Sequence, residues 1–268
     1  IPPPPPYETI ANATSANKNK RIQELINKYE IDPLFSEKLN LLSDFEIVLL
    51  LDDSGSMNTP LTDGSGHATR WDELKSVVNI VISIATIFDD DGIDVHFLNR
   101  ENTDSVKDLN QVTTIMNDPP QGLTPLTSSL NKIFIKYRDS IKPVLVIIAT
   151  DGVPYNGVCD LDNFKNLLLK KNHSKFFVSF LACSDNDKDI DYLNDLDKNV
   201  PNVDTLDDYN SEKKEVLKVQ GSQFNYSFAD HVCRLLLGPI CEELDLLDEY
   251  RLDQLDKERN FRCKCTIL

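Results

Sequence analysis

An uninterrupted run of apolar residues at 47–51 ends abruptly in the polar sequence Asp-Asp-Ser-Gly-Ser. Such a run is typical of a strand that is buried on both faces of a parallel sheet. Proteins with α/β folds place their ligands at the carboxyl edge of such a sheet. Asp52, Ser54 and Ser56 would then direct one carboxylate and two hydroxyls toward a single point. Oxygen ligands of this kind are preferred by a small, hard cation such as Mg²⁺.

Two later segments add to this pattern. Gly-Leu-Thr-Pro-Leu-Thr at 122–127 precedes a predicted helix, and the apolar run at 144–149 is followed by Thr-Asp-Gly. Together with Asp-x-Ser-x-Ser, these segments resemble the von Willebrand factor A (vWA) domain and its metal-ion-dependent adhesion site. The resemblance implies bound Mg²⁺ or Mn²⁺, with three hydroxyls as ligands and two carboxylates acting directly or through water. The residues at these positions are Ser54, Ser56 and Thr124, and Asp52 and Asp151.

The spacing of apolar residues after residue 44 alternates between strands and helices. Strands are predicted at 46–51, 93–98, 144–149, 176–182 and 203–206, and helices at 70–88, 107–116, 126–137, 161–170 and 190–196. Such alternation predicts an α/β fold, in which a doubly wound, mostly parallel sheet is flanked by helices, as in vWA and Rossmann-like folds.

The remaining segments divide the chain into four parts. Residues 1–18 are rich in proline and small polar residues, so they are expected to be disordered, and residues 19–43 have the apolar spacing of a helical extension. The vWA domain is expected at 44–240, followed by a charged tail at 241–268. Four segments look like a cytosolic vWA branch of protists, fungi and large DNA viruses, which says little about a partner: 69–74, 97–100, 207–209 and 219–221.

The net charge and the cysteine spacing limit the partners and the cellular location that we expect. A formal net charge of -16, with no long basic stripe, argues against nucleic acid as a partner. The acidic runs at 89–91 and 184–189 are expected to be mostly solvated loops, with a second cation site as the minority interpretation. Six irregularly spaced cysteines without a Cys-x-x-Cys pair indicate reduced thiols, and no apolar stretch is long enough to span a bilayer. The body of the protein is therefore predicted to be cytoplasmic.

The residues around Ser54 and Ser56 exclude two classes of enzyme. A phosphatase of the haloacid dehalogenase type needs a second acid two positions after its aspartate, where this chain has Ser54. An α/β-hydrolase needs Gly-x-Ser-x-Gly, and neither Ser54 nor Ser56 has the flanking glycines. The four histidines show no ligand or triad spacing. The sequence therefore does not predict an enzyme.

The amino-terminal end carries a short recognition motif. Pro4, Pro5 and Tyr7 match Pro-Pro-x-Tyr (PPxY), the ligand of WW domains, and the neighbouring prolines favour the polyproline II helix that these domains bind. WW-bearing ubiquitin ligases are the partner class that this motif implies. The alternative is a flexible spacer that no domain recognises.

The carboxyl-terminal end carries a lipidation motif. Cys265 is followed by Thr-Ile-Leu, which fits a prenylation box, and the final leucine favours geranylgeranyl. Cys263 is the candidate for a second, palmitoyl, anchor. Because one lipid chain gives only marginal membrane binding, stable attachment at the membrane periphery would need both. The alternative is an unmodified tail with two exposed thiols.

These observations lead to two hypotheses of different classes. The first is a metal-dependent protein-interaction module, which binds an Asp or Glu of a partner at a vacant metal position and is tethered to a membrane if the tail is lipidated. The second is a structural or scaffold protein, for example a virion or assembly component, which uses the vWA domain for fixed subunit contacts. Dependence of partner binding on the metal separates them.

Overall fold

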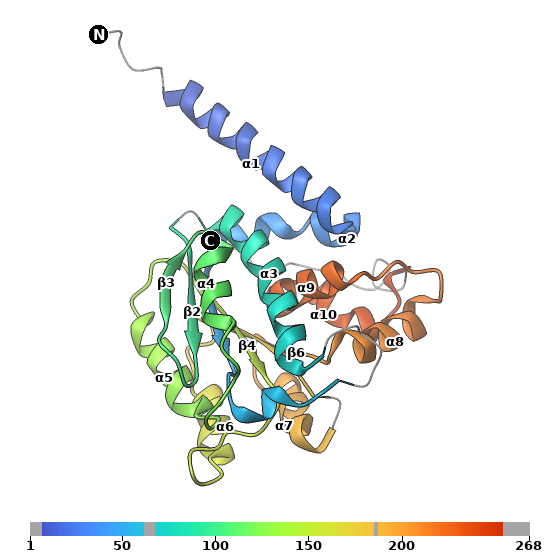
Figure 1. The fold of residues 1–268 in the computed structure, drawn as a ribbon. Helices are drawn as coiled ribbons and strands as arrows, with labels where there is room; N and C mark the ends of the chain where they lie inside the picture. The colour runs from blue at the N-terminus through green and yellow to red at the C-terminus, as the bar shows by residue number, and fades with distance from the viewer. Residues whose placement is uncertain (1–6, 62–67, 90, 185–186, 254–268) are drawn as a thin grey trace, which may run out of the picture.

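The computed structural model describes residues 7–61, 68–89, 91–184 and 187–253. Its centre is a six-stranded sheet in the order β3-β2-β1-β4-β5-β6, in which only β3 is antiparallel to its neighbour (Figure 1). The doubly wound, mostly parallel α/β fold class is confirmed. The strands are β1 (Glu46–Leu51), β2 (Ile93–Phe97), β3 (Thr103–Val106), β4 (Val144–Thr150), β5 (Phe176–Ala182) and β6 (Val203–Leu206).

Helices cover both faces of the sheet because β1 is apolar on both sides. Ile47, Leu49 and Leu51 point into one hydrophobic cluster, and Val48 and Leu50 point into another. The first cluster includes α3 (Arg70–Phe88), α4 (Leu109–Met116), α8 (Tyr209–Gln220) and α9 (Phe228–Leu237). The second includes α5 (Leu126–Lys136), α6 (Leu161–Leu169) and α7 (Asp187–Asn199). Because its side chains alternate between these two clusters, β1 lies in a sheet that is packed between two layers of helices.

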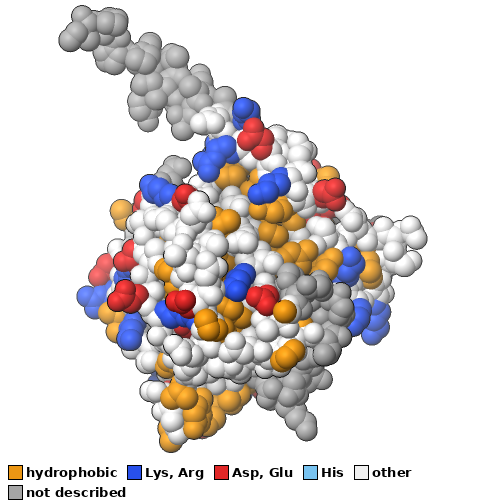
Figure 2. Space-filling view, in the orientation of Figure 1, with side chains coloured by type: hydrophobic (Ala, Val, Ile, Leu, Met, Phe, Trp, Pro, Cys, Tyr) orange, Lys and Arg blue, Asp and Glu red, His pale blue; other side chains and the backbone are white. Residues whose placement is uncertain are grey.

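The described surface agrees with the charge pattern of the sequence. On the face shown in Figure 2, Lys and Arg side chains are scattered among Asp and Glu and form no continuous stripe. None of the described helices combines the length and the apolar character that crossing a membrane requires.

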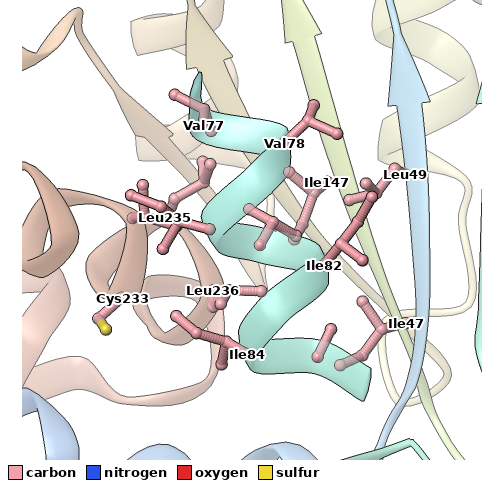
Figure 3. Packing of buried hydrophobic residues seen from close by; sticks show 14 of the residues in the cluster. Ile47, Leu49, Val77, Val78, Ile82, Ile84, Ile147, Cys233, Leu235 and Leu236 are labelled. Atoms are coloured by element: carbon pink, nitrogen blue, oxygen red, sulfur yellow. The ribbon is translucent and has the colours of Figure 1, made fainter. Parts of the chain in front are cut away.

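Helix α3 runs along the strands, from the carboxyl ends of the sheet to the amino ends. Its first turn is capped by Thr69, whose side chain accepts a hydrogen bond from the Asp72 N–H. Most of its length is buried, and Figure 3 shows Val78 and Ile82 on the side that faces Leu49 and Ile147 of the sheet, and Ile84 beside Leu236 of α9. At about 1.5–3 kcal/mol for each fully buried aliphatic side chain, this packing fixes α3 firmly on the sheet.

Both ends of the packed body differ from the sequence prediction. Helix α1 (Tyr7–Tyr29) begins well inside the segment 1–18 that was expected to be disordered, and it is followed by α2 (Pro33–Ser36) and the 3₁₀ helix η1 (Leu39–Asp44). At the other end, η3 (Gly238–Ile240), α10 (Glu242–Asp245) and η4 (Leu246–Asp248) follow α9. Leu244 and Leu247 are fully buried, so the packed body continues past residue 240.

A buried histidine in α9 gives stability a defined pH dependence. His231 is 1% exposed, and burial together with nearby Arg234 lowers its pKa to about 3. The unfolded chain, with a histidine pKa of about 6.5, binds an extra proton as the pH falls below that value, so folding stability is lost. Between pH 7 and pH 4.5 the wild type should lose about 2 kcal/mol more unfolding free energy than His231→Asn. Urea titrations of both proteins, with His173→Asn as the matched histidine control, measure the difference, and parallel profiles would contradict it.

Candidate metal centre

The carboxyl ends of β1 and β4 bring the predicted aspartates to one place. These strands are parallel neighbours with Leu51 paired to Ala149, so the residues that follow them leave the sheet side by side. Asp52 is 0% exposed and Asp151 is 2% exposed. After Ser54, the chain enters a single 3₁₀ turn, η2 (Gly55–Asn58), which bends it across the edge of the sheet.

Four of the five predicted ligands form one hydrogen-bonded group. The Ser54 and Ser56 hydroxyls lie 3.0 Å apart, and the Ser56 hydroxyl donates to Asp151 Oδ1 at 2.7 Å. Asp52 Oδ1 accepts from the Ser54 N–H at 2.9 Å. The Thr150 hydroxyl donates to Asp52 Oδ2 at 2.6 Å, a contact that no motif in the sequence predicts. Ser56 is exposed, so the group opens to solvent on that side.

Thr124 approaches the same group on a loop that the backbone holds in place. The Gly55 N–H donates to the Gly122 carbonyl at 3.2 Å, and Thr124 exchanges two backbone hydrogen bonds with Tyr155, at 3.0 and 2.9 Å. Gly122 has φ 111°, and a Cβ there would lie 2.4 Å from Asn99 Oδ1. This turn therefore requires glycine. The loop is connected to η2 and to the segment after β4, the two segments that carry the other ligands.

Arg70, at the start of α3, was missed as a residue of this centre. Its Nη1 donates to Asp151 Oδ2 at 2.9 Å and its Nη2 donates to the Ser184 hydroxyl at 2.9 Å. Arg70 is 9% exposed, so this is a buried ion pair on the side of Asp151 away from Ser56. The only signal in the sequence was its place in the 69–74 segment, and that signal came from family resemblance.

Asp53 points away from the centre and forms an ion pair with an arginine side chain. Arg100 Nε donates to Asp53 Oδ2 at 2.8 Å, and the Asn99 N–H donates to Asp53 Oδ1 at 2.8 Å. The guanidinium of Arg100 also donates to the carbonyls of the 115–119 segment and lies 5.1 Å from the Trp71 ring. Asp53 therefore fastens the loops behind the centre, and its charge is neutralised.

The donor set fits a small, hard cation. Carboxylate and hydroxyl oxygens surround one edge position, and they include no nitrogen or sulfur ligand that would favour a softer metal. Burial and the neighbouring Asp151 charge raise the pKa of Asp52 to about 7, although hydrogen bonds from Thr150 and Ser54 oppose the shift. A divalent cation beside both carboxylates would relieve this repulsion. In the protein such an ion would be held by Asp52, Ser54, Ser56, Thr124 and Asp151.

Other predicted site residues lie outside the described part of the chain. These are Pro4 and Pro5 of the PPxY motif and the two candidate lipidation cysteines, Cys263 and Cys265. Tyr7 is the first residue of α1.

Comparisons with known proteins provide a distant structural likeness. No protein-family model matches the sequence, and no curated protein matches it. Among solved structures, the chain is similar to the PilB minor pilin from Streptococcus sanguinis, at 15% identity over 61% of this chain and 57% of the pilin, with a TM-score of 0.45. It is also similar to the manganese-loaded TRAP protein of Plasmodium vivax, at 17% identity over 64% of this chain and 72% of that one, with a TM-score of 0.41. The chain thus matches little more than half the length of the pilin.

Proposed function

We propose that this protein is a metal-dependent protein-interaction module of the vWA type. The observation that carries the proposal is the hydrogen-bonded group of Asp52, Ser54, Ser56 and Asp151 at the carboxyl edge of the sheet, with the Thr124 loop fastened against it. In this proposal the protein's oxygens hold Mg²⁺ or Mn²⁺, and one coordination position is left for a carboxylate of a partner.

Arg70 makes the loaded centre more favourable to an acidic partner. Asp52, Asp151 and the nearby buried Glu73 carry three negative charges when ionised, and Arg70 carries one positive charge. A divalent cation changes the sum of these four groups from -2 to 0, and without Arg70 the same ion would leave -1. The attraction for a partner's carboxylate would therefore come from the vacant position on the ion itself, and Arg70 would add to it.

An apolar rim around the centre supports a protein partner over a small ion or metabolite. Leu123, Tyr155 and Val158 are 44%, 41% and 71% exposed, and they lie on the loop of Thr124 and the loop that follows β4. Figure 2 shows hydrophobic side chains gathered at the lower end of the view, near α6. These exposed apolar side chains supply surface that a protein partner could bury when it contacts the ion.

The experiment is affinity capture with the full chain in Mg²⁺ and in excess chelator. Thr124→Ala should lose the captured partner as completely as chelator does, because it removes a metal ligand from a surface loop and leaves no core cavity. Thr127→Ala, at the second residue of α5, is the matched control and should retain the partner. Unfolding curves of the variants check that the fold is intact.

Two outcomes separate the hypotheses. Capture that requires both the ion and Thr124 supports the adhesion-type module. A partner that copurifies in fixed stoichiometry, in chelator and with Thr124→Ala, would instead support the scaffold hypothesis.

The recognition motifs at the chain ends are separate parts of the proposal. Prenylation at Cys265, with palmitoylation at Cys263, would hold the protein at a membrane, and the PPxY motif would recruit a WW-domain protein. Neither requires the metal centre. The proposal assigns binding and no catalysis, and it places the protein in the cytoplasm or at the membrane periphery.

A further inference from the structure

A short hairpin follows β4 and holds an aromatic side chain beside the candidate metal centre. Residues 154–160 form this hairpin, in which two backbone hydrogen bonds of 3.2 and 2.9 Å lie on either side of the Tyr155–Cys159 pair. Gly157 in its turn has φ 84°, a conformation that favours glycine. In Figure 1 this segment lies at the lower end of the view, beside α6. The hairpin is therefore a small ordered element and not an open loop.

Both ends of the hairpin are fastened to neighbouring helices. The Tyr192 hydroxyl of α7 donates to the Gly152 carbonyl at 3.0 Å, just before the hairpin begins. At the last residue of the hairpin, Asn163 Nδ2 of α6 donates to Asp160 Oδ1 at 2.6 Å. A preorganised element loses little conformational entropy when it binds a partner. The hairpin is thus a suitable base for a contact residue.

Tyr155 is also paired directly with Thr124, a proposed ligand of the ion. The two residues exchange both of their backbone hydrogen bonds, at 3.0 and 2.9 Å, which is the hydrogen-bonded arrangement of an antiparallel pair. Residues opposite each other in this arrangement have Cα atoms about 5.5 Å apart and direct their side chains to the same face. Thr124, Tyr155 and Cys159 thus form one row, and exposure rises along it from 9% at Thr124 to 41% at Tyr155. The row begins at the metal centre and extends outward.

The Tyr155 side chain has no partner within the described residues. Its hydroxyl forms no hydrogen bond there, and its ring contacts no other ring or cation. By contrast, the hydroxyls of the buried Tyr137 and Tyr226 both form hydrogen bonds. An exposed tyrosine on a rigid base offers a large contact area at a low cost in side-chain entropy, and tyrosine is enriched among the residues that dominate binding energy. Tyr155 therefore has the properties of a partner contact.

The chemistry around Tyr155 favours an apolar contact over a charged one. On its own face Tyr155 lies between Thr124 and Cys159, and neither is an acidic or basic residue. Asp160, the one acidic residue of the hairpin, follows Cys159 and so points to the opposite face, where it accepts from Asn163. A basic side chain of a partner would find no counter-charge on the Tyr155 face, and an acidic one would bind the ion instead.

We propose that Tyr155 determines which partners the centre accepts, because its ring binds a large apolar side chain next to the Asp or Glu that coordinates the ion. This role rests on the proposed function and adds to it the class of segment recognised. Consecutive Cα atoms of a partner are about 3.8 Å apart, and those of Thr124 and Tyr155 about 5.5 Å. A residue one or two positions from the coordinating acid can therefore reach the ring.

The test is selection from a random peptide library displayed on phage, with the full chain immobilised in Mg²⁺. Peptides released by chelator should contain Asp or Glu, with Leu, Ile, Phe or Trp within two positions of it. Tyr155→Ala should still select the acid but lose the apolar neighbour, whereas Tyr155→Phe should select the same peptides as the wild type. Tyr250→Ala, which removes a tyrosine that is 47% exposed elsewhere, is the matched control and should also select them.

Calorimetry with one selected peptide separates recognition from support of the metal centre. Tyr155→Ala should weaken the Kd of the peptide by about tenfold, the effect of losing one good aromatic contact. Its Kd for Mg²⁺ should stay within about twofold of the wild type, because alanine makes the same backbone hydrogen bonds to Thr124. The same peptide with Asn in place of its acid should bind neither protein.

The outcomes distinguish the role of Tyr155 from the function on which it rests. Acidic peptides without an apolar preference, or with a preference that Tyr155→Ala retains, would overturn this role and leave the metal-dependent module intact. Loss of binding in Tyr155→Phe would assign recognition to the hydroxyl and overturn the apolar contact. Equal losses of peptide and Mg²⁺ affinity in Tyr155→Ala would mean that Tyr155 only supports the Thr124 loop. Selection that requires neither Mg²⁺ nor an acid would contradict the proposed function itself.

Discussion

Replacing Arg234 by methionine should lower the free energy of unfolding by about 3–5 kcal/mol. Arg234 is 2% exposed and forms a buried ion pair with Glu212 and a partly exposed one with Asp248, the latter at 2.7 Å. Its Nη2 also donates to the Asp245 carbonyl at 2.9 Å. Methionine preserves much of the side-chain volume but leaves the Glu212 carboxylate buried without its cation. Burial already raises the pKa of Glu212 to about 7 against the opposing effect of Arg234.

Matched variants separate the buried charge from loss of packing. Arg234→Met with Glu212→Gln should recover part of the loss, because the uncompensated carboxylate has been removed. Arg138→Met breaks an exposed pair with Asp139 and should cost less than about 1 kcal/mol. Urea denaturation of the four proteins gives the comparison. If Arg234→Met were as stable as Arg138→Met, Arg234 would not hold the carboxyl-terminal segment as the contacts indicate.

Substitutions at Asp151 and Arg70 should change the affinity of the candidate metal centre for Mg²⁺ in opposite directions. Asp151→Asn should lower Mg²⁺ affinity by about 100-fold or more, because it removes one of two carboxylates and leaves the positive charge of Arg70 beside the ion. Arg70→Gln should change the affinity in the opposite direction, because it removes that repulsion while keeping both carboxylates. The same Arg70→Gln protein should bind an acidic partner more weakly, because the loaded centre loses one positive charge.

Calorimetric titration of Mg²⁺ into both variants measures these opposite signs. Gln is the matched control for Arg70 because it can still donate one hydrogen bond toward Asp151 or Ser184. Equal losses of affinity in Asp151→Asn and Arg70→Gln would mean that Arg70 only supports the fold of the centre, and the charge argument would then fail.

The elements with the strongest apolar patterns could be predicted from the sequence. The prediction gave β5 and β6 with the bounds found in the structure, and it placed α3, α5 and α6 to within a residue or two. Each of these segments has one apolar face, or two, at regular spacing, which determines both its type and its burial. The same pattern placed Asp52 and Asp151 each at the end of a strand, whereas their meeting in one site was implied by the resemblance to the vWA domain.

Features that depend on tertiary contacts could not be predicted in this way. β3 is a polar edge strand of only four residues, so it has no apolar alternation, and only its pairing with β2 reveals it. Segment 241–248 reads as charged because four of its eight residues are acidic, yet Leu244 and Leu247 fill the core beside α9. Arg70 lies 81 residues from Asp151 in the sequence, and no local pattern predicts that ion pair.

Anomalous diffraction from crystals grown in Mn²⁺ would locate the ion directly. We expect a manganese peak about 2.0–2.2 Å from the hydroxyl oxygens of Ser54, Ser56 and Thr124, with Asp52 and Asp151 in direct or water-mediated contact. Crystals of Asp151→Asn grown in the same way should lack the peak. Saturating Mn²⁺ that leaves this position empty in the wild type, with the Ser56 hydroxyl still donating to Asp151, would contradict the assignment of a metal centre.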